Sequence, residues 1–157
     1  MSKIETDRAE KTGQADQADR ADRADKAEID ALTAEFFGVF DNRGGRTPEV
    51  ARLRRLVLPE GVIVVTGPRF TVYTLDAFIE PRQRLLTGGR LVEFSEWETS
   101  ERTEIAGDIA SRFGTYRKSG FLDGTPYEGE GTKSFQFVRH PELAGRLLHL
   151  VRPAVTA

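Results

Sequence analysis

The sequence predicts a single α+β domain in which helices come first and a sheet of long antiparallel strands follows. Two patterns support this fold class. Apolar residues recur at helical spacing from Ile29, and after Gly88-Gly89 the chain changes to alternating segments separated by turn residues. This order is typical of a sheet with one face covered by helices. A chain of 157 residues has room for one core of this kind.

The first 26 residues are expected to form a polar extension outside that core. From Ala15 the chain reads "ADQADRADRADKAE", and a three-residue repeat spirals around a helix instead of forming an apolar stripe. Acid-first pairs four residues apart, such as Asp16 with Arg20, favour a solvated helix. A frayed or solvated helix is therefore predicted, and a helix that binds a partner is the alternative.

The next part of the chain is predicted to alternate helices with short strands. The apolar pattern indicates helices at 29–40, 47–58 and 74–86, and β-branched or aromatic runs indicate strands at 62–66 and 70–73. Pro48 suits the first turn of the second helix, and Thr74 is the expected N-cap of the third. Pro81 is expected to kink this third helix or to start its second part.

The C-terminal half is predicted to be a sheet. Four segments with strand texture follow one another, at 90–105, 109–119, 127–138 and 146–151. Gly107-Asp108 and Asp123-Gly124 between them are dipeptides typical of tight hairpins. The domain is therefore expected to span residues 27–153, with residues 154–157 as a tail.

Residues 128–137, "EGEGTKSFQF", look at first like a phosphate-binding loop. A Walker A loop needs glycine directly before the lysine and a helix after it, whereas here Thr132 separates Gly131 from Lys133. The residues that follow alternate with period two, which predicts a strand. The glycines are instead expected to mark a bulge, a bend, or a close approach of another backbone.

Two-residue hairpins would fix which side chains share a face of the sheet. With Ala106 opposite Ile109 and Leu122 opposite Thr125, one face collects Trp97, Ile105, Arg112, Tyr116, Lys133, Phe135 and Phe137. This apolar set is predicted to face the helices and meet Phe36 and Phe40. Polar groups buried among aromatic rings must be paired or serve a ligand, so the set also marks the expected small-molecule pocket.

Two alternatives accompany this assignment. Arg112 and Lys133 could sit at the rim and pair with acids such as Glu98 or Glu130. The opposite face collects Glu98, Ser111, Phe113, Thr115, Ser134 and Gln136, a half-apolar set that suits packing against a second copy of the chain. The carboxylates at 93, 96, 98, 101 and 104 are expected to be solvated.

Composition narrows the functional classes. The chain has no Cys, which excludes disulfides and thiol chemistry, and its formal charge of -2 gives no electrostatic case for nucleic acid or an anionic membrane. No long apolar run predicts a leader or a membrane span, so a cytoplasmic protein is expected. His140 and His149 stand apart, without the spacing of a metal site, and neither a metal nor a cofactor is expected.

The stretch "RTEIAGDIASRFGTYRKSGFLDGTPYEGEGTKSFQFVR" at 102–139, with "EPRQ" at 80–83, resembles SnoaL-like and ketosteroid-isomerase-like domains of the nuclear transport factor 2-like superfamily. The resemblance covers residues 27–151. It implies a cystatin-like cone, in which a long N-terminal helix and two further helices pack on a strongly curved mixed sheet of about six strands. It also implies an internal pocket and homodimers formed through the sheet.

Departures from this pattern argue against ketosteroid isomerisation. Ketosteroid isomerases carry a carboxylate base near the end of the first strand, and residues 62–66, "VIVVT", offer none. They also use a tyrosine on the first helix, where this chain has Phe36, Phe37 and Phe40. The C-terminal "GRLLHLVRPAVTA" lacks the Trp and the acidic tail of many relatives.

Three functions remain open at this point. The leading hypothesis is a protein that binds a small apolar or aromatic molecule, with an acidic group of that molecule facing Arg112 or Lys133. The first alternative is a cofactor-independent isomerase, cyclase or dehydratase acting on a small aromatic or polyketide-like substrate, in which Tyr116 donates a hydrogen bond to an oxyanion and His149 moves the proton. The second is a structural dimerisation domain whose pocket is filled by its own side chains.

Overall fold

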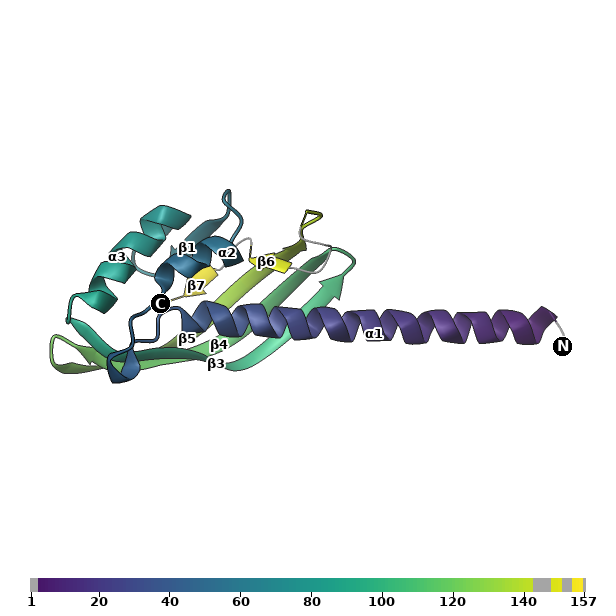
Figure 1. Cartoon of the computed structure of the whole chain (residues 1–157), viewed down its shortest axis with the longest axis horizontal. Helices are drawn as coiled ribbons and strands as arrows, with labels where there is room; N and C mark the ends of the chain where they lie inside the picture. The colour runs from purple at the N-terminus through teal and green to yellow at the C-terminus, as the bar shows by residue number, and fades with distance from the viewer. Residues whose placement is uncertain (1–2, 143–147, 151–153, 157) are drawn as a thin grey trace.

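A computed structural model of the protein describes residues 3–142, 148–150 and 154–156. It confirms the α+β class with the helices first (Figure 1). The elements are, in chain order, α1 (Lys3–Gly38), the 3-10 turns η1 (Arg43–Gly45) and η2 (Val50–Arg52), α2 (Leu53–Leu56), β1 (Val62–Thr66), β2 (Thr71–Thr74), α3 (Leu75–Thr87), β3 (Leu91–Ala106), β4 (Ile109–Leu122), β5 (Thr125–Arg139), β6 (Leu148–Leu150) and β7 (Ala154–Thr156).

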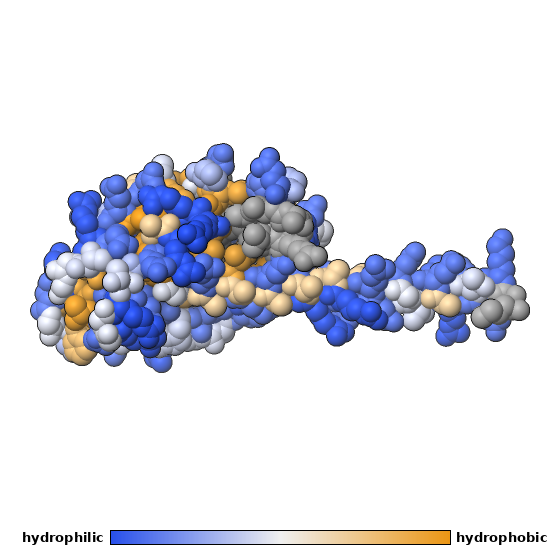
Figure 2. Space-filling view, in the orientation of Figure 1, coloured by the Kyte–Doolittle hydropathy of each residue, from blue (hydrophilic) through white to orange (hydrophobic). Residues whose placement is uncertain are grey.

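Helix α1 is continuous from the polar repeat into the aromatic segment. Its first two-thirds project beyond the sheet (Figure 1), and residues 3–24 are all exposed. Figure 2 shows this projection covered largely by hydrophilic residues. Pairs four residues apart, Lys11 with Asp7 and Arg23 with Asp19, contact one another along it. The predicted solvated helix is thus present, and within the described part of the chain no helix is apolar and long enough to cross a membrane.

The elements between α1 and the long strands follow the prediction, with one shorter helix. Thr74 caps α3 by accepting a hydrogen bond from the Ala77 amide at 3.3 Å, and Pro81 lies inside that helix. The predicted helix at 47–58 is reduced to η2 and α2. Strands β1 and β2 lie where the β-branched runs placed them.

Within the described residues the sheet has seven strands, in the order β2-β1-β7-β5-β4-β3 with β6 paired to β5. It is mixed, because β7 runs parallel to β1 and antiparallel to β5. Residues 154–157, expected to form a tail, therefore contain a strand that joins the two halves of the sheet. The strong curvature expected of a cone is absent, since the long strands of Figure 1 bend only gently.

Both predicted hairpins are confirmed. Ala106 pairs with Ile109, and Leu122 pairs with Thr125. Gly107 has a φ of +59°, and Asp123 and Gly124 both have positive φ, as tight hairpin turns require. The ladder between β4 and β5 runs without interruption through residues 128–131, so the glycines of that run mark no bulge.

Strand β3 carries the irregularities instead. Its register against β4 shifts twice, between Val92 and Ser95 and again between Glu98 and Ser100. Each shift inserts one extra residue, and a one-residue shift moves all side chains beyond it to the other face. The predicted faces hold from Ser100 to Ala106, are exchanged between the two shifts, and are restored at Leu91 and Val92. The exchanged segment decides which charged residues of β3 reach the site.

The core lies between α1, α3 and the inner face of the sheet. Phe36 on α1 packs edge-on against Phe135 on β5, with ring centroids 5.2 Å apart, and Phe40 meets Phe78 on α3 at 6.3 Å. The buried side chain of Asn42 ties the end of α1 to its neighbours. It donates to the carbonyls of Leu86 and Leu91 and accepts from the Phe94 amide.

Candidate functional site

A cavity of about 360 Å³ lies between α1, α3 and the inner face of the sheet. It reaches the surface beside α3, because Pro81 lines it and is exposed. Most of its wall is aromatic or aliphatic, and it also contains three bases and one acid. The lining residues are Phe36, Phe40, Val65, Phe78, Pro81, Arg82, Leu85, Leu86, Leu91, Phe94, Glu96, Tyr116, Lys118, Tyr127 and Lys133.

Lys133 is the deepest charged group of this cavity. Its side chain on β5 is 5% exposed and contacts the carboxylate of Glu96, which is 10% exposed, on β3. The Lys133 Nζ lies 3.4 Å from the centre of the Tyr116 ring and 5.1 Å from that of Phe37. Burial and then repulsion by the Arg82 guanidinium lower the pKa of Lys133 to about 7.

Glycines on the strands leave room for these side chains. The stem of Lys118 lies flat over Gly129, where an added Cβ would come within 2.7 Å of the Lys118 Cε. Gly114 leaves room for the side chain of Glu98 in the same way, because a Cβ at Gly114 would lie 2.7 Å from Glu98 Oε2. Gly114 and Gly129 therefore admit long polar side chains from neighbouring strands.

Two further bases line the cavity, on different elements. Arg82 on α3 places its guanidinium 3.5 Å from the centre of the Phe78 ring and donates to the Phe78 carbonyl at 3.1 Å. Burial lowers the pKa of Arg82, which nevertheless stays charged at any physiological pH. The Nζ of Lys118 on β4 lies 5.0 Å from the centre of the Tyr127 ring. Three bases beside one acid, Glu96, favour an anionic group in a ligand.

Tyr116 also lines the cavity, because it lies on the face of β4 that was predicted to point toward the helices. Burial raises the pKa of its hydroxyl above the ordinary value of 10.0, so the group is protonated at neutral pH. Tyr116 is therefore placed as a hydrogen-bond donor. Its predicted partner His149 pairs with Val138 through the backbone, and the His149 side chain lies outside the described residues.

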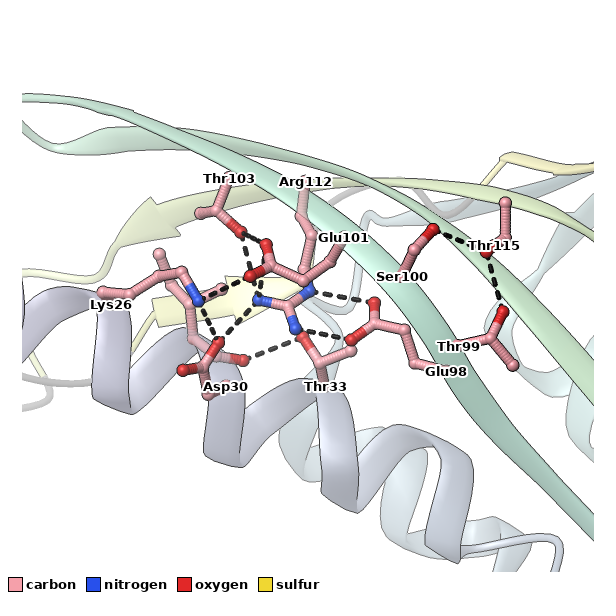
Figure 3. Close-up of polar contacts among 11 residues, drawn as sticks. Lys26, Asp30, Thr33, Glu98, Thr99, Ser100, Glu101, Thr103, Arg112 and Thr115 are labelled. Carbon is pink, nitrogen blue, oxygen red and sulfur yellow. Dashed lines mark hydrogen bonds and ion pairs between the residues drawn. The ribbon is translucent and has the colours of Figure 1, made fainter.

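Arg112 does not line the cavity. It is 4% exposed and sits between α1 and the sheet, where it donates to Glu98, Asp30 and Thr103 (Figure 3). Burial acts to lower the pKa of Arg112. The hydrogen bonds that Arg112 donates to Glu98 and Asp30 outweigh this effect, and the pKa is raised. The alternative in which Arg112 pairs with Glu98 is thus correct, although the pair is buried and not at the rim. Arg112 attaches α1 to β3 and β4.

Trp97, predicted to be a pocket residue, is 43% exposed and lies opposite Arg117 on the outer face. The extra residue in β3 at Thr99 explains this position, because it exchanges the faces of Trp97 and its neighbours. The same shift turns Glu96 and Glu98 inward, so the expected solvated row of carboxylates is wrong at these two positions. Phe36, Phe40, Tyr116 and Lys133 line the cavity as predicted, while Phe135 is buried in the core behind it.

The sequence-based assignment missed Arg82, Glu96, Lys118 and Tyr127. One signal could have found Glu96. Buried bases need acidic partners, and a register in which β3 turns Glu96 and Glu98 inward gives Lys133 and Arg112 such partners. No comparable signal marks Arg82, because its position depends on how α3 packs on the sheet. In the part of the chain that the structure describes, no group of three or more Asp, Glu or His side chains could hold a metal ion.

Comparison with curated proteins finds a relative whose sequence identity is too low to establish a family for this chain. Large ribosomal subunit protein uL10 of Bifidobacterium animalis subsp. lactis (strain AD011) is 29% identical over 132 residues, which cover 76% of each chain. No family model matches the chain. The similarity to solved structures is far more extensive.

Three solved structures illustrate this similarity of fold. A nuclear transport factor 2-like protein with a cystatin-like fold from Novosphingobium aromaticivorans has a TM-score of 0.63 at 17% identity, over 92% of this chain and 88% of that one. A nuclear transport factor 2-like superfamily protein from Salmonella enterica has a TM-score of 0.68 at 12% identity, over 86% and 91%. A candidate scytalone dehydratase from N. aromaticivorans has a TM-score of 0.64 at 10% identity, over 83% and 81%. This chain has the nuclear transport factor 2-like, cystatin-like fold.

Proposed function

We propose that the protein binds a small aromatic or amphipathic molecule that carries an acidic group. The observation that carries this proposal is the cavity of about 360 Å³, whose wall is mainly aromatic and aliphatic and includes Arg82, Lys118 and Lys133. Ligand pockets in proteins have about 300–1,000 Å³ and combine an apolar wall with a few polar groups. An open space of this size argues against the alternative of a structural dimerisation domain whose pocket is filled by its own side chains.

The charges suggest where the acidic group would lie. Lys133 already contacts Glu96, whereas Arg82 and Lys118 lie over the aromatic rings of Phe78 and Tyr127. A carboxylate would therefore face Arg82 or Lys118, and the apolar body would lie against Phe36 and Phe40. Arg112 has no part in this site, because its donors are engaged by Glu98 and Asp30.

Calorimetric titration with matched aromatic compounds tests the proposal. Small aryl carboxylates should bind more tightly than their neutral amides. Arg82→Met should reduce this preference by about tenfold, because one charged contact of a ligand is worth roughly 1.5–3 kcal/mol. Arg55→Met, an exposed base outside the cavity, is the matched control. Equal binding of acid and amide to the unmodified protein would contradict the charge assignment.

A cavity-filling variant tests the location. Leu85→Trp places a larger ring in the cavity and should abolish binding, whereas Ile109→Trp on the exposed outer face should leave it unchanged. Circular dichroism and thermal unfolding of both variants control for folding. Binding that survives in a folded Leu85→Trp protein would place the ligand elsewhere.

A second candidate function is a cofactor-independent isomerase, cyclase or dehydratase. The observation that favours it is the protonated hydroxyl of Tyr116 beside the Lys133–Glu96 pair, which together offer a hydrogen-bond donor and a proton-transfer pair. Candidate enzymes such as the scytalone dehydratase share the fold. Once a substrate is identified, Tyr116→Phe should lower kcat with little change in KM, and an unchanged kcat would remove Tyr116 from the reaction.

A further inference from the structure

The amine of Lys133 combines three properties that buried structural lysines do not need. Its side chain is 5% exposed, it lines a cavity open to the surface, and it lies against a carboxylate, that of Glu96. Aromatic rings surround it, with the centre of the Tyr116 ring 3.4 Å from Nζ. A lysine needed only for packing would be replaced at little cost by an apolar residue of similar volume.

The surroundings of Lys133 act on its protonation state in opposite directions. Desolvation and the Arg82 guanidinium disfavour the ammonium form, while the Glu96 carboxylate and the face of Tyr116 favour it. Burial and then Arg82 lower the pKa of Lys133 to about 7, so the side chain can lose its proton close to neutral pH. Neutral amines are nucleophiles, and desolvation beside another cation is a known way to activate a lysine.

We propose that Lys133 forms an imine with the carbonyl group of a small aldehyde or ketone held in the cavity, and that Glu96 transfers the protons of this step. The proposal rests on the proposed function, since it names the reactive group of the ligand that the cavity would bind. It assigns Lys133 as the nucleophile and Glu96 as the acid and base.

The step balances without a cofactor. The neutral Nζ attacks the carbonyl carbon, a C–N bond forms, and a proton passes from nitrogen to oxygen through the Glu96 carboxylate to give a carbinolamine. The nitrogen of the carbinolamine then forms the C=N bond as the C–O bond breaks, and Glu96 carries the remaining N–H proton to the departing hydroxide, which leaves as water. Addition of water reverses the sequence and releases the carbonyl compound. No oxidant or reductant is consumed.

The other cavity groups define the class of carbonyl compound. The aromatic and aliphatic wall suits an aromatic or unsaturated body, and Arg82 and Lys118 on other parts of the wall suit an acidic group. An aromatic aldehyde or ketone that also carries a carboxylate fits both requirements. The ligand class of the proposed function is thereby narrowed to aromatic oxo acids.

Reductive trapping of 4-carboxybenzaldehyde with cyanoborohydride tests the imine. The reagent reduces the C=N bond to a stable secondary amine, and intact mass and peptide mapping then count and locate the adducts. The chain has five lysines, at 3, 11, 26, 118 and 133, so the other four serve as internal references. Lys133 should be modified first and at least about tenfold faster than Lys118, since the amine of Lys133 is buried in the cavity and its pKa is lowered to about 7.

Two variants sharpen the result. Lys133→Met combined with Glu96→Gln removes the amine without leaving an unpaired buried charge, and it should lose the fast adduct while remaining folded by circular dichroism. Glu96→Gln alone keeps the nucleophile but loses the acid, so trapping at Lys133 should slow by about tenfold or more. Modification spread evenly over the lysines, or unchanged in the double variant, would overturn the proposal.

A matched acid without the carbonyl separates this proposal from the proposed function. Both 4-carboxybenzaldehyde and 4-methylbenzoate should raise the Tm if the cavity binds aromatic acids, and only the aldehyde should be trapped. Binding of both compounds without an adduct at Lys133 would overturn the imine and leave the binding function standing. If neither compound binds nor reacts, both proposals are contradicted for this ligand class.

Discussion

The guanidinium of Arg112 and the carboxylate of Glu98 form two hydrogen bonds across β4 and β3, at 3.0 Å from Nε and 2.5 Å from Nη2. Arg112 also donates to Asp30 at 2.7 Å, which links α1 to the sheet (Figure 3). Both partners of the first pair are largely buried, with side-chain exposures of 5% and 17%. Removing one partner would leave the other as an unpaired buried charge.

Arg112→Met is therefore expected to lower the free energy of unfolding by about 3–5 kcal/mol, the usual effect of breaking a buried ion pair. Urea unfolding measures this change. Arg117→Met is the matched control, because Arg117 pairs with Glu130 in an exposed contact of 3.6 Å and its loss should change stability by less than about 1 kcal/mol. Equal effects of the two substitutions would show that the Arg112 network does not hold α1 on the sheet.

The stability of the protein should rise with pH above neutrality. The pKa of Lys133 is lowered from 10.5 to about 7 by burial and by Arg82, so between these values the folded protein binds fewer protons than the unfolded chain. The free energy of unfolding then increases with pH from about 7, and the raised pKa of Tyr116 opposes this increase only from about pH 10.0 upward, where the unfolded chain begins to lose the tyrosine proton. Lys133→Met with Glu96→Gln should flatten the increase, as measured by urea unfolding at about pH 7 and about pH 9. A slope that survives in the double variant would assign the effect to other groups.

Asn42 is expected to be the most sensitive neutral polar position of the core. Asn42→Ala would leave the carbonyls of Leu86 and Leu91 and the amide of Phe94 without this partner, at about 1–3 kcal/mol for a buried group. Thermal unfolding should show a marked fall in Tm. Gln14→Ala on the exposed part of α1 is the control, with no measurable loss expected. A stable Asn42→Ala protein would mean that water replaces the amide at this junction.

Gly114→Ala should destabilise the sheet. A Cβ at Gly114 would lie 2.8 Å from the Ser100 carbonyl oxygen and 2.7 Å from Glu98 Oε2, and the carbonyl belongs to the backbone and cannot move aside. Gly13→Ala has open space around it in α1 and should stabilise that helix by about 0.5–1 kcal/mol. Paired unfolding curves check the opposite signs, and a neutral Gly114→Ala would contradict the close contact.

The outer face of the sheet is expected to pair two copies of the chain. Trp97, Ile109, Phe113 and Phe121 are large apolar residues exposed on it, and exposed apolar patches of this kind are typical of interfaces. Phe113→Glu should shift the molecular mass measured by light scattering from dimer to monomer. Phe70→Glu, at another exposed aromatic residue that lies away from the long strands, should not. A monomeric unmodified protein would exclude this homodimer.

Local sequence patterns predicted most of the fold. The hairpin dipeptides fixed the pairing of β3, β4 and β5 near their turns, and Thr74 correctly marked the start of α3. These features depend on neighbouring residues only, since turn conformation and helix capping are local. Tyr116 and Lys133 were placed in the pocket because alternation along an unbroken strand is local too, and Phe36 and Phe40 because helical spacing is local.

Only the tertiary structure decided the polar part of the site. The bulge at Thr99 turns Trp97 outward and turns Glu96 and Glu98 inward. The position of this bulge depends on how Arg112 and Lys133 find acidic partners across the sheet. Strand β7 pairs with strands far away in the chain, so no local pattern announced it. The sequence by itself thus determined most of the elements and part of the aromatic wall of the cavity. Long-range pairing determined which charges face it, because buried charges are stable only where a partner from another strand meets them.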